Sequence, residues 1–201
     1  MITPRRRPSL ALAFSRLRRA RIGRATLGAV AEHRAETSAA LLLLLAGCFA
    51  LVPIPGLPIG IIFGSLAMCV AVPLMFGYRR IALPRRLAER PLPPALVARV
   101  VRYALPPLRW IERRTRPRLV GFARGIGARF AYATATLSAA LVTMPVPFGN
   151  TLPALAIVLV ALGLNRQDGV TTIAGHVTAA LGVAWNVFLV AGGIALVRHV
   201  A

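Results

Sequence analysis

The sequence contains no lysine and little negative charge. Its 25 basic residues are all arginine and stand against five acidic residues, which gives a net charge of +20. It also has only two cysteines, Cys48 and Cys69, so neither a disulfide framework nor a cysteine metal cluster is expected. Charged residues make up 15% of the 201 residues and hydrophobic residues 57%, a composition that excludes intrinsic disorder.

Long segments without any charge interrupt this basic chain. They cover residues 38–78, 130–165 and 170–197. A strongly basic chain often binds nucleic acid, but domains of that kind rarely contain such apolar runs, and no stacking pattern of aromatic residues accompanies the arginines. Apolar runs of about 20 residues are typical of transmembrane helices. We therefore predict an all-α integral membrane protein and no nucleic-acid partner.

The arginines fall into two blocks. Nine lie between Arg5 and Arg34, and fourteen lie between Arg79 and Arg129. Because positive residues close to membrane segments stay on the cytoplasmic side, we expect both blocks to be cytoplasmic. The predicted organisation is a basic extension, residues 1–37, followed by one multi-pass membrane domain, residues 38–201.

The first uncharged segment is predicted to form a hairpin, residues 38–78. Its first arm, residues 38–52, would be about 22 Å long as a helix, less than the hydrocarbon core of about 30 Å. Pro53 and Pro55 then break the helix, and residues 59–78 are long enough to return across the bilayer.

The second uncharged segment repeats this design over residues 130–164. Residues 130–144 form the first arm, a Pro-x-Pro break follows at Pro145 and Pro147, and residues 154–164 would return over only about 16 Å. We interpret the pair as an internal repeat of broken hairpins, with at least the second one re-entrant. The alternative is that each Pro-x-Pro forms the outer turn of an ordinary hairpin. Residues 170–197 are predicted to be a final transmembrane helix.

The arginine-rich segment 79–129 is predicted to be cytoplasmic and amphipathic. Apolar residues recur at helical spacing between residues 97 and 111, with arginines between them and Trp110 near the end. A basic amphipathic helix with a tryptophan fits the headgroup layer, so anionic membrane lipids are expected partners.

Residues that could carry chemistry are few. The sequence has no zinc-protease motif, nucleophile elbow, phosphate loop or pair of carboxylates, so we expect neither an enzyme nor a cofactor or metal site. Polar groups at broken helices can instead bind ligands, because a helix that starts after a break presents free amides to an anionic group. The candidate substrate-binding residues are Pro53, Pro55, Gly56, Pro145, Pro147, Gly149, Asn150, Asp168 and His176.

Three of these candidates also have structural interpretations. Asp168 precedes Gly169 between two apolar segments, where it could form a turn and cap the next helix. His176 lies inside an apolar segment, where an ionisable group is a functional candidate, but it could also bond Thr172 one turn earlier. Asn150 could bind a polar ligand or satisfy the broken backbone.

Several motifs occur in an order that resembles one known family. The blocks are Pro53-x-Pro55-Gly56, Leu83-Pro84, Ala104-Leu105-Pro106, Arg116-Pro117-Arg118, Pro145-x-Pro147-Phe148-Gly149-Asn150 and Asp168-Gly169. From about residue 36 onward the chain resembles the ExoD family of bacterial exopolysaccharide-synthesis membrane proteins.

The resemblance implies an inner-membrane protein that supports exopolysaccharide synthesis or export. The leading hypothesis is that the two Pro-x-Pro breaks face each other and bind a phosphate-bearing lipid or a lipid-linked sugar carrier. The alternative is a non-transporting scaffold or partner of the polysaccharide-synthesis proteins. Oligomeric state, substrate identity and the side of the C-terminus do not follow from the sequence.

Overall fold

The computed structural model describes residues 35–51, 59–78, 102, 105–144, 146 and 148–200. Within these residues every regular element is helical, as predicted. The main helices are α3 (Ala35–Ala50), α4 (Ile59–Met75), α8 (Gly125–Thr143), α9 (Thr151–Arg166) and α10 (Gly169–Val200). A short helix, α7 (Leu105–Arg114), and a 3₁₀ turn, η1 (Val120–Ala123), precede α8.

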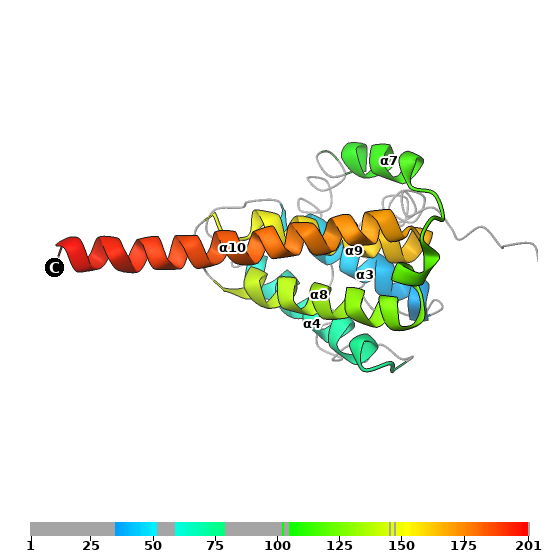
Figure 1. Cartoon of the computed structure of the whole chain (residues 1–201), viewed down its shortest axis with the longest axis horizontal. Coiled ribbons are helices and arrows are strands. Elements are labelled where there is room, and N and C mark those ends of the chain that lie inside the picture. Colours follow the sequence, from blue (N-terminus) through cyan, green and yellow to red (C-terminus); the bar gives the residue numbers. More distant parts are fainter. Residues whose placement is uncertain are drawn as a thin grey trace, which may run out of the picture.

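The five main helices form a bundle in which each helix runs opposite to the one before it (Figure 1). Helix α3 packs on α4 and α9, α8 packs on α4 and α9, and α10 packs on α9 and α8. One end of this bundle, called here the basic end, holds α7, η1 and the starts of α8 and α10. The other end, called here the tip, holds the end of α8 and the starts of α4 and α9 (Figure 1).

Helix α3 is buried on all sides. Leu42, Leu43, Leu44 and Leu45 are consecutive and at most 2% exposed, although four successive helical residues point in all directions around the axis. Close contacts between helices extend from this core. A methyl group on Gly47 would lie 2.8 Å from the Val158 side chain, so α3 and α9 approach as only small residues allow.

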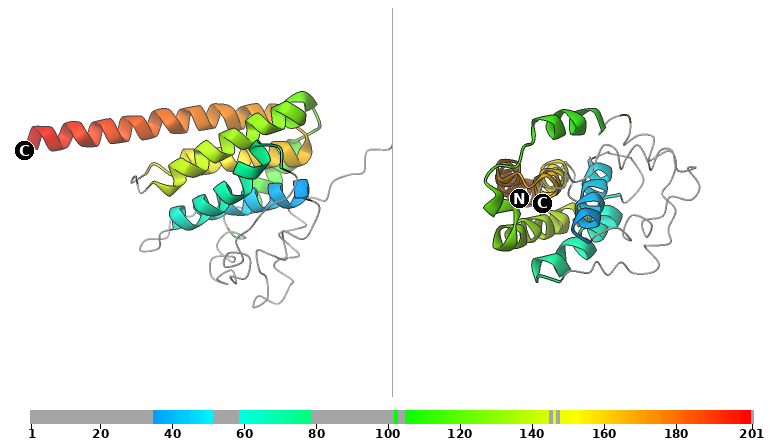
Figure 2. Two further views of the ribbon diagram at one scale, coloured as in Figure 1. Left: turned by 90° about the horizontal axis from the view of Figure 1, so that it is seen from below. Right: turned by 90° about the vertical axis from the view of Figure 1, so that its right-hand side faces the viewer.

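Helix α10 is much longer than its neighbours and continues past the tip (Figure 2). Residues 191–199 are all exposed, and no other atom lies within 4 Å of a methyl group placed on Gly192 or Gly193. By length and composition, Gly169–His199 is the one helix in the described ranges that could cross a membrane, and its most apolar window is only 11% buried. The predicted final helix, residues 170–197, lies within α10.

Two helix boundaries in the second predicted hairpin were wrong. Helix α8 begins at Gly125, before residue 130, because the exposed Arg129 is accommodated in its first turns. Helix α9 spans Thr151–Arg166, longer than 154–164, because Pro153 lies in its first turn, where no amide is needed. The arms are therefore about 28 Å and 24 Å long. Residues 1–34, most of 79–104, and the break residues 52–58, 145 and 147 lie outside the described residues, so the repeat of Pro-x-Pro breaks stays a prediction.

Candidate functional site

The turn between α8 and α9 is held by two side chains of α10. The indole Nε1 of Trp185 donates a hydrogen bond to the carbonyl of Phe148 at 3.1 Å. The amide Nδ2 of Asn186 donates to the carbonyls of Gly149 and Gly182, both at 2.9 Å. Asn186 is 4% exposed. Backbone carbonyls that the chain break leaves outside any helix are thus satisfied by α10.

Gly149 and Asn150, two of the predicted site residues, lie at this turn. A methyl group on Gly149 would lie 2.5 Å from Asn186 Oδ1, so only glycine fits without a shift. Asn150 is half-buried just before α9 and makes no side-chain cap to that helix. Among the described residues, the Oδ1 atoms of Asn150 and Asn186 are both buried without a hydrogen-bond partner.

The start of α4 meets this turn. A methyl group on Gly60 would lie 2.5 Å from the carbonyl oxygen of Val142 and 2.8 Å from Asn150 Nδ2. Gly60 is the second residue of α4, directly after the first predicted break. The chain after one break therefore touches the chain after the other. Pro53, Pro55, Gly56, Pro145 and Pro147, the remaining predicted tip residues, lie outside the described residues.

Asp168 lies at the opposite end of the bundle and is fully buried. Its carboxylate accepts hydrogen bonds from the Val170 amide at 3.0 Å and the Thr171 hydroxyl at 3.1 Å, which is the helix cap considered from the sequence. It also accepts the amide of Arg116 at 3.2 Å and lies 3.7 Å from the Arg118 guanidinium. The carboxylate therefore joins the start of α10 to residues 116–118.

Two further contacts tighten this junction. The Gly169 amide donates to the Arg118 carbonyl at 2.6 Å, and Arg124 bonds Gln167 through their side chains. Leu119 packs so closely on Gly169 that a side chain at position 169 would collide with the backbone of Leu119. The connection between α7 and α8 is consequently fixed against the α9–α10 turn.

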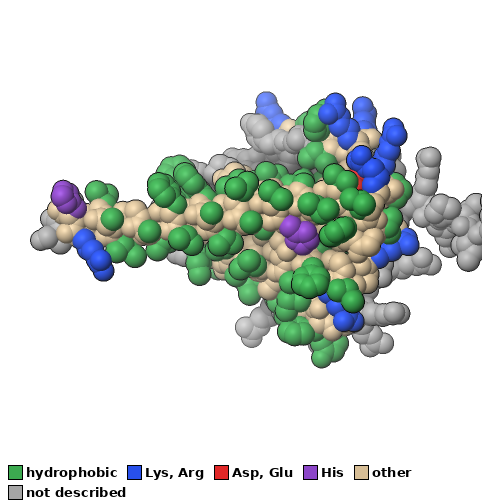
Figure 3. All heavy atoms as spheres, viewed as in Figure 1, with side chains coloured by type: hydrophobic (Ala, Val, Ile, Leu, Met, Phe, Trp, Pro, Cys, Tyr) green, Lys and Arg blue, Asp and Glu red, His purple; other side chains and the backbone are tan. Residues whose placement is uncertain are grey.

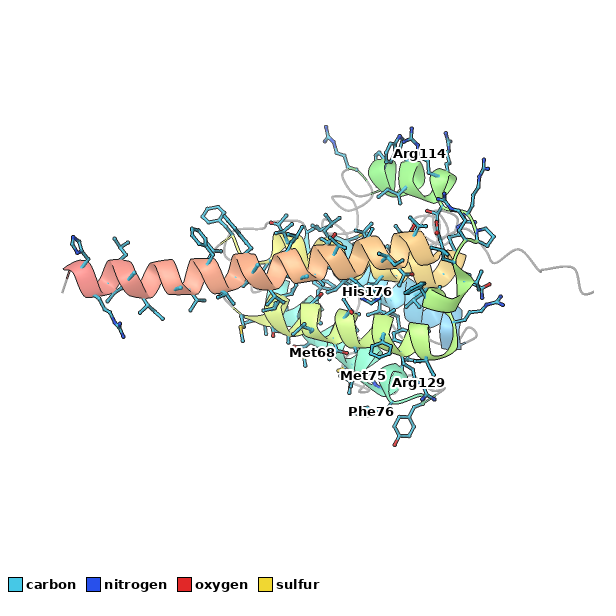
Figure 4. The ribbon with its side chains drawn as sticks, viewed as in Figure 1. Met68, Met75, Phe76, Arg114, Arg129 and His176 are labelled. Atoms are coloured by element: carbon cyan, nitrogen blue, oxygen red, sulfur yellow. The ribbon has the colours of Figure 1, made fainter. Side chains whose placement is uncertain are left out.

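His176 lies between these two places, on α10 beside α8 (Figure 4). Its Nδ1 is 2.6 Å from the Thr134 hydroxyl of α8. His176 and Thr172, both described, do not form the hydrogen bond that was considered from the sequence. The Thr172 hydroxyl donates instead to the Asp168 carbonyl at 3.0 Å.

The four predicted site residues that the structure describes therefore do not form one site. Along α10, His176 is about 15 Å and Asp168 about 27 Å from Asn186, at 1.5 Å per residue. Gly149 and Asn150 belong to the tip, Asp168 belongs to the basic end, and His176 lies between them. The described residues contain no group of three or more His, Cys, Asp or Glu side chains that could hold a metal ion.

Sequence reasoning missed the partners of these residues. Trp185 and Asn186 were not among the predicted site residues, and Arg116 and Arg118 were used only as part of a family motif. The signals were present: an indole and an amide interrupt an apolar segment, and the Arg-Pro-Arg block occurs in the same ordered set of motifs as Asp-Gly. Both signals become contacts in the fold.

Comparison with known proteins gives two kinds of match. The family model described as "Exopolysaccharide synthesis, ExoD" matches residues 10–188. An uncharacterised protein of Synechocystis is 32% identical over 131 residues, which cover 64% of this chain and 61% of that protein. Protein ExoD of Rhizobium meliloti is 27% identical over 129 residues, which cover 62% of this chain and 52% of that protein. The chain thus aligns with less than two thirds of either relative, and no solved structure matches it.

Proposed function

This chain belongs to the ExoD family, which is described by its role in exopolysaccharide synthesis, and we propose that the chain acts in that process as a non-enzymatic protein of the bacterial inner membrane. In this proposal α10 spans the bilayer, and the tip lies inside the hydrocarbon layer. The tip binds a phosphate-bearing lipid or a lipid-linked sugar carrier during synthesis or export.

The position of the tip along α10 carries this proposal. Helix α10 has 32 residues and is about 48 Å long. Asn186, which bonds the α8–α9 turn, lies about 26 Å from Gly169 and about 18 Å from Arg198. The tip is therefore level with the interior of the apolar span, since a hydrocarbon core of about 30 Å centred on α10 would extend beyond Asn186 on both sides.

The exposed end of α10 supports the same placement. Beyond Asn186 it carries six large apolar side chains that are 48–67% exposed: Val187, Phe188, Val190, Ile194, Leu196 and Val197. If the tip lay at the membrane surface, these side chains would stand in water. At about 1 kcal/mol or more for each, this arrangement would cost on the order of 5–10 kcal/mol.

The chemistry of the tip suits a polar group held at membrane depth. Broken backbone in the bilayer is tolerated only when protein or a cavity shields it, and Trp185 and Asn186 provide bonds of that kind. The first amides of α9 favour an anionic group such as a phosphate. The side-chain Oδ1 atoms of Asn150 and Asn186 can accept hydrogen bonds from the hydroxyl groups of a sugar.

The orientation follows from charge. Most exposed arginines of the described residues gather around α7 and the neighbouring end of the bundle, with Arg198 at the far end of α10 as an exception, while the surface of α8 and α10 is largely apolar (Figure 3). By the positive-inside rule this end, and the N-terminal arginine block, are cytoplasmic. The C-terminus then lies outside.

Cysteine accessibility tests the depth of the tip. We suggest Phe148→Cys, because Phe148 is 86% exposed at the turn, in a background with Cys48 and Cys69 replaced by alanine. A re-entrant tip predicts that a membrane-impermeant maleimide added outside intact cells leaves Phe148→Cys unlabelled, whereas the control His199→Cys is labelled. Ready labelling of both positions would show that the tip is an ordinary outer turn.

A second experiment tests binding. Asn150→Ala removes the half-buried amide at the start of α9, whereas Thr178→Ala removes a hydroxyl that bonds only its own helix, at 2.8 Å from the Ala174 carbonyl. At equal membrane abundance we expect Asn150→Ala to lower polysaccharide output and Thr178→Ala to keep it. Full output from Asn150→Ala would exclude a binding site that depends on this amide.

The second candidate function is a non-transporting scaffold for the polysaccharide-synthesis proteins. Exposed apolar side chains on α8, including Phe130 at 66% and Leu137 at 51%, favour it because they could contact another membrane protein. In that case Leu137→Ala would lower polysaccharide output while Asn150→Ala would not. The binding proposal predicts the reverse.

A further inference from the structure

We propose that the outer surface of α7 binds anionic lipid headgroups and anchors the basic end at the membrane boundary. The surface, called here the α7 basic face, consists of Trp110, Arg113 and Arg114 of α7 together with Arg116 and Arg118 of the connection that follows it. It is distinct from the tip and goes beyond the proposed role in carrier binding, but it uses the same placement of α10 across the bilayer.

Helix α7 has an inner and an outer side. Ile111 packs against the hydrophobic core, and Thr115 is 8% exposed with its hydroxyl donating to the Ile111 carbonyl at 2.7 Å. Trp110, Arg113 and Arg114 lie on the other side and are exposed. The Arg114 guanidinium lies 4.0 Å from the centre of the Trp110 ring, and Figure 4 shows Arg114 pointing away from the bundle. The outer side is thus both basic and aromatic.

The α7 basic face is fixed at the level where α10 begins. Arg116 donates a backbone hydrogen bond to the Asp168 carboxylate, and Arg118 forms an ion pair with Asp168 and accepts a hydrogen bond from the Gly169 amide. Helix α10 begins at Gly169. Figure 1 accordingly shows α7 beside the basic end of the bundle. If α10 enters the hydrocarbon a few residues after Gly169, this face lies in the headgroup layer, where tryptophan and arginine are favoured.

The charge of this face favours an anionic partner, because residues 109–118 contain five arginines and one acidic residue, Glu112. Asp168, the described carboxylate at this end, is fully buried and already bonded, whereas Arg118 is 54% exposed. Exposed apolar side chains lie close by in the chain: Leu119 at 57%, Phe122 at 50% and Ile126 at 71%. A mixture of arginine and exposed apolar side chains fits the boundary between phosphates and acyl chains better than it fits a nucleic acid, which would leave the apolar groups in water.

Tryptophan quenching by lipid tests this proposal. The full chain carries two tryptophans, so Trp185→Phe leaves Trp110 as the single fluorophore. The protein is placed in bilayer discs of phosphatidylcholine with increasing phosphatidylglycerol, and the acyl chains of one lipid or the other are brominated. We expect brominated phosphatidylglycerol to quench Trp110 more than brominated phosphatidylcholine at the same mole fraction.

Single-charge variants identify the residues responsible. Arg113→Gln and Arg114→Gln are each expected to lower the apparent affinity for phosphatidylglycerol about fivefold, the effect of one arginine near an anionic surface. Arg114→Lys should keep that affinity, because it retains the charge without the planar stack on Trp110. Arg198→Gln is the matched control, since it removes one exposed arginine from the far end of α10.

The outcomes separate the possible partners. The proposal is supported if phosphatidylglycerol quenches Trp110 preferentially and if Arg113→Gln weakens this quenching while Arg198→Gln leaves it unchanged. Equal quenching by both lipids overturns it, because the face would then contact the bilayer without selecting charge. Absence of lipid quenching, with quenching on addition of RNA, overturns it in favour of nucleic acid. Each result is independent of whether the tip binds a carrier, because Trp110 reports only on the basic end.

Discussion

Placing a charge on α10 just beyond the tip distinguishes a re-entrant tip from an outer turn. Val190 is 48% exposed and lies about 6 Å past Asn186 and about 12 Å before Arg198. With the tip inside the bilayer, residue 190 lies in the hydrocarbon layer. An arginine near the centre of a spanning helix costs about 2.5–3.5 kcal/mol on insertion scales. Because the side chain can reach toward the outer headgroups, we expect Val190→Arg to cost about 2–3 kcal/mol.

The matched control is Val197→Arg. Val197 is 67% exposed and adjacent to Arg198, so its substitution adds the same charge close to the membrane boundary and should cost less than about 1 kcal/mol. The ratio of inserted to non-inserted α10 is measured on the full chain with a glycosylation acceptor fused after residue 201 and translated with microsomal membranes. Each 1.4 kcal/mol changes that ratio about tenfold.

The expected result is a fall in the glycosylated fraction for Val190→Arg and little change for Val197→Arg. If both variants are glycosylated as fully as the unmodified chain, residue 190 does not lie in the hydrocarbon layer. The tip would then lie at the membrane surface, and the depth calculated from Asn186 would be wrong.

Three further predictions concern the contacts that hold the bundle, each measured by thermal unfolding in detergent. Asp168→Asn keeps the size of the side chain but removes the negative charge of the carboxylate, whose oxygen accepts a hydrogen bond from the Arg116 amide. We expect the free energy of unfolding to fall by about 1–3 kcal/mol. An unchanged midpoint would mean that this junction contributes no stability. Asn186→Leu leaves a turn carbonyl unpaired and should cost about 1–3 kcal/mol, whereas Val187→Leu, at a neighbouring exposed position, should stay within about 0.5 kcal/mol. Equal effects of the two substitutions would contradict the role of Asn186. Gly163→Ala places a methyl group 2.7 Å from the Thr172 amide nitrogen and should cost about 1–3 kcal/mol of stability. The control Gly192→Ala, in open space, should be neutral or stabilising. A larger loss of stability for Gly192→Ala than for Gly163→Ala would contradict the close packing of α9 on α10.

Much of the helical architecture could be predicted from composition and periodicity. The final uncharged segment, residues 170–197, lies inside the observed α10, and Asp168 caps that helix as its position before Gly169 suggested. Boundaries marked by charge or proline were less accurate. Arg129 and Pro153 both lie inside helices, because an exposed arginine is compatible with a helix and proline fits the first turn.

The sequence by itself determined where charge and apolar surface fall along the chain, and hence the helices, the basic end and the family. These are local properties: each depends on residue type and on neighbours within a few positions. Only the tertiary structure decided which polar groups meet. Thr134 reaches His176 across 42 positions, and Asn186 reaches the Gly149 carbonyl across 37. Such pairs depend on how long helices pack and in what register, which local patterns do not encode. The four described binding candidates were therefore divided between the two ends of the bundle, with His176 between them.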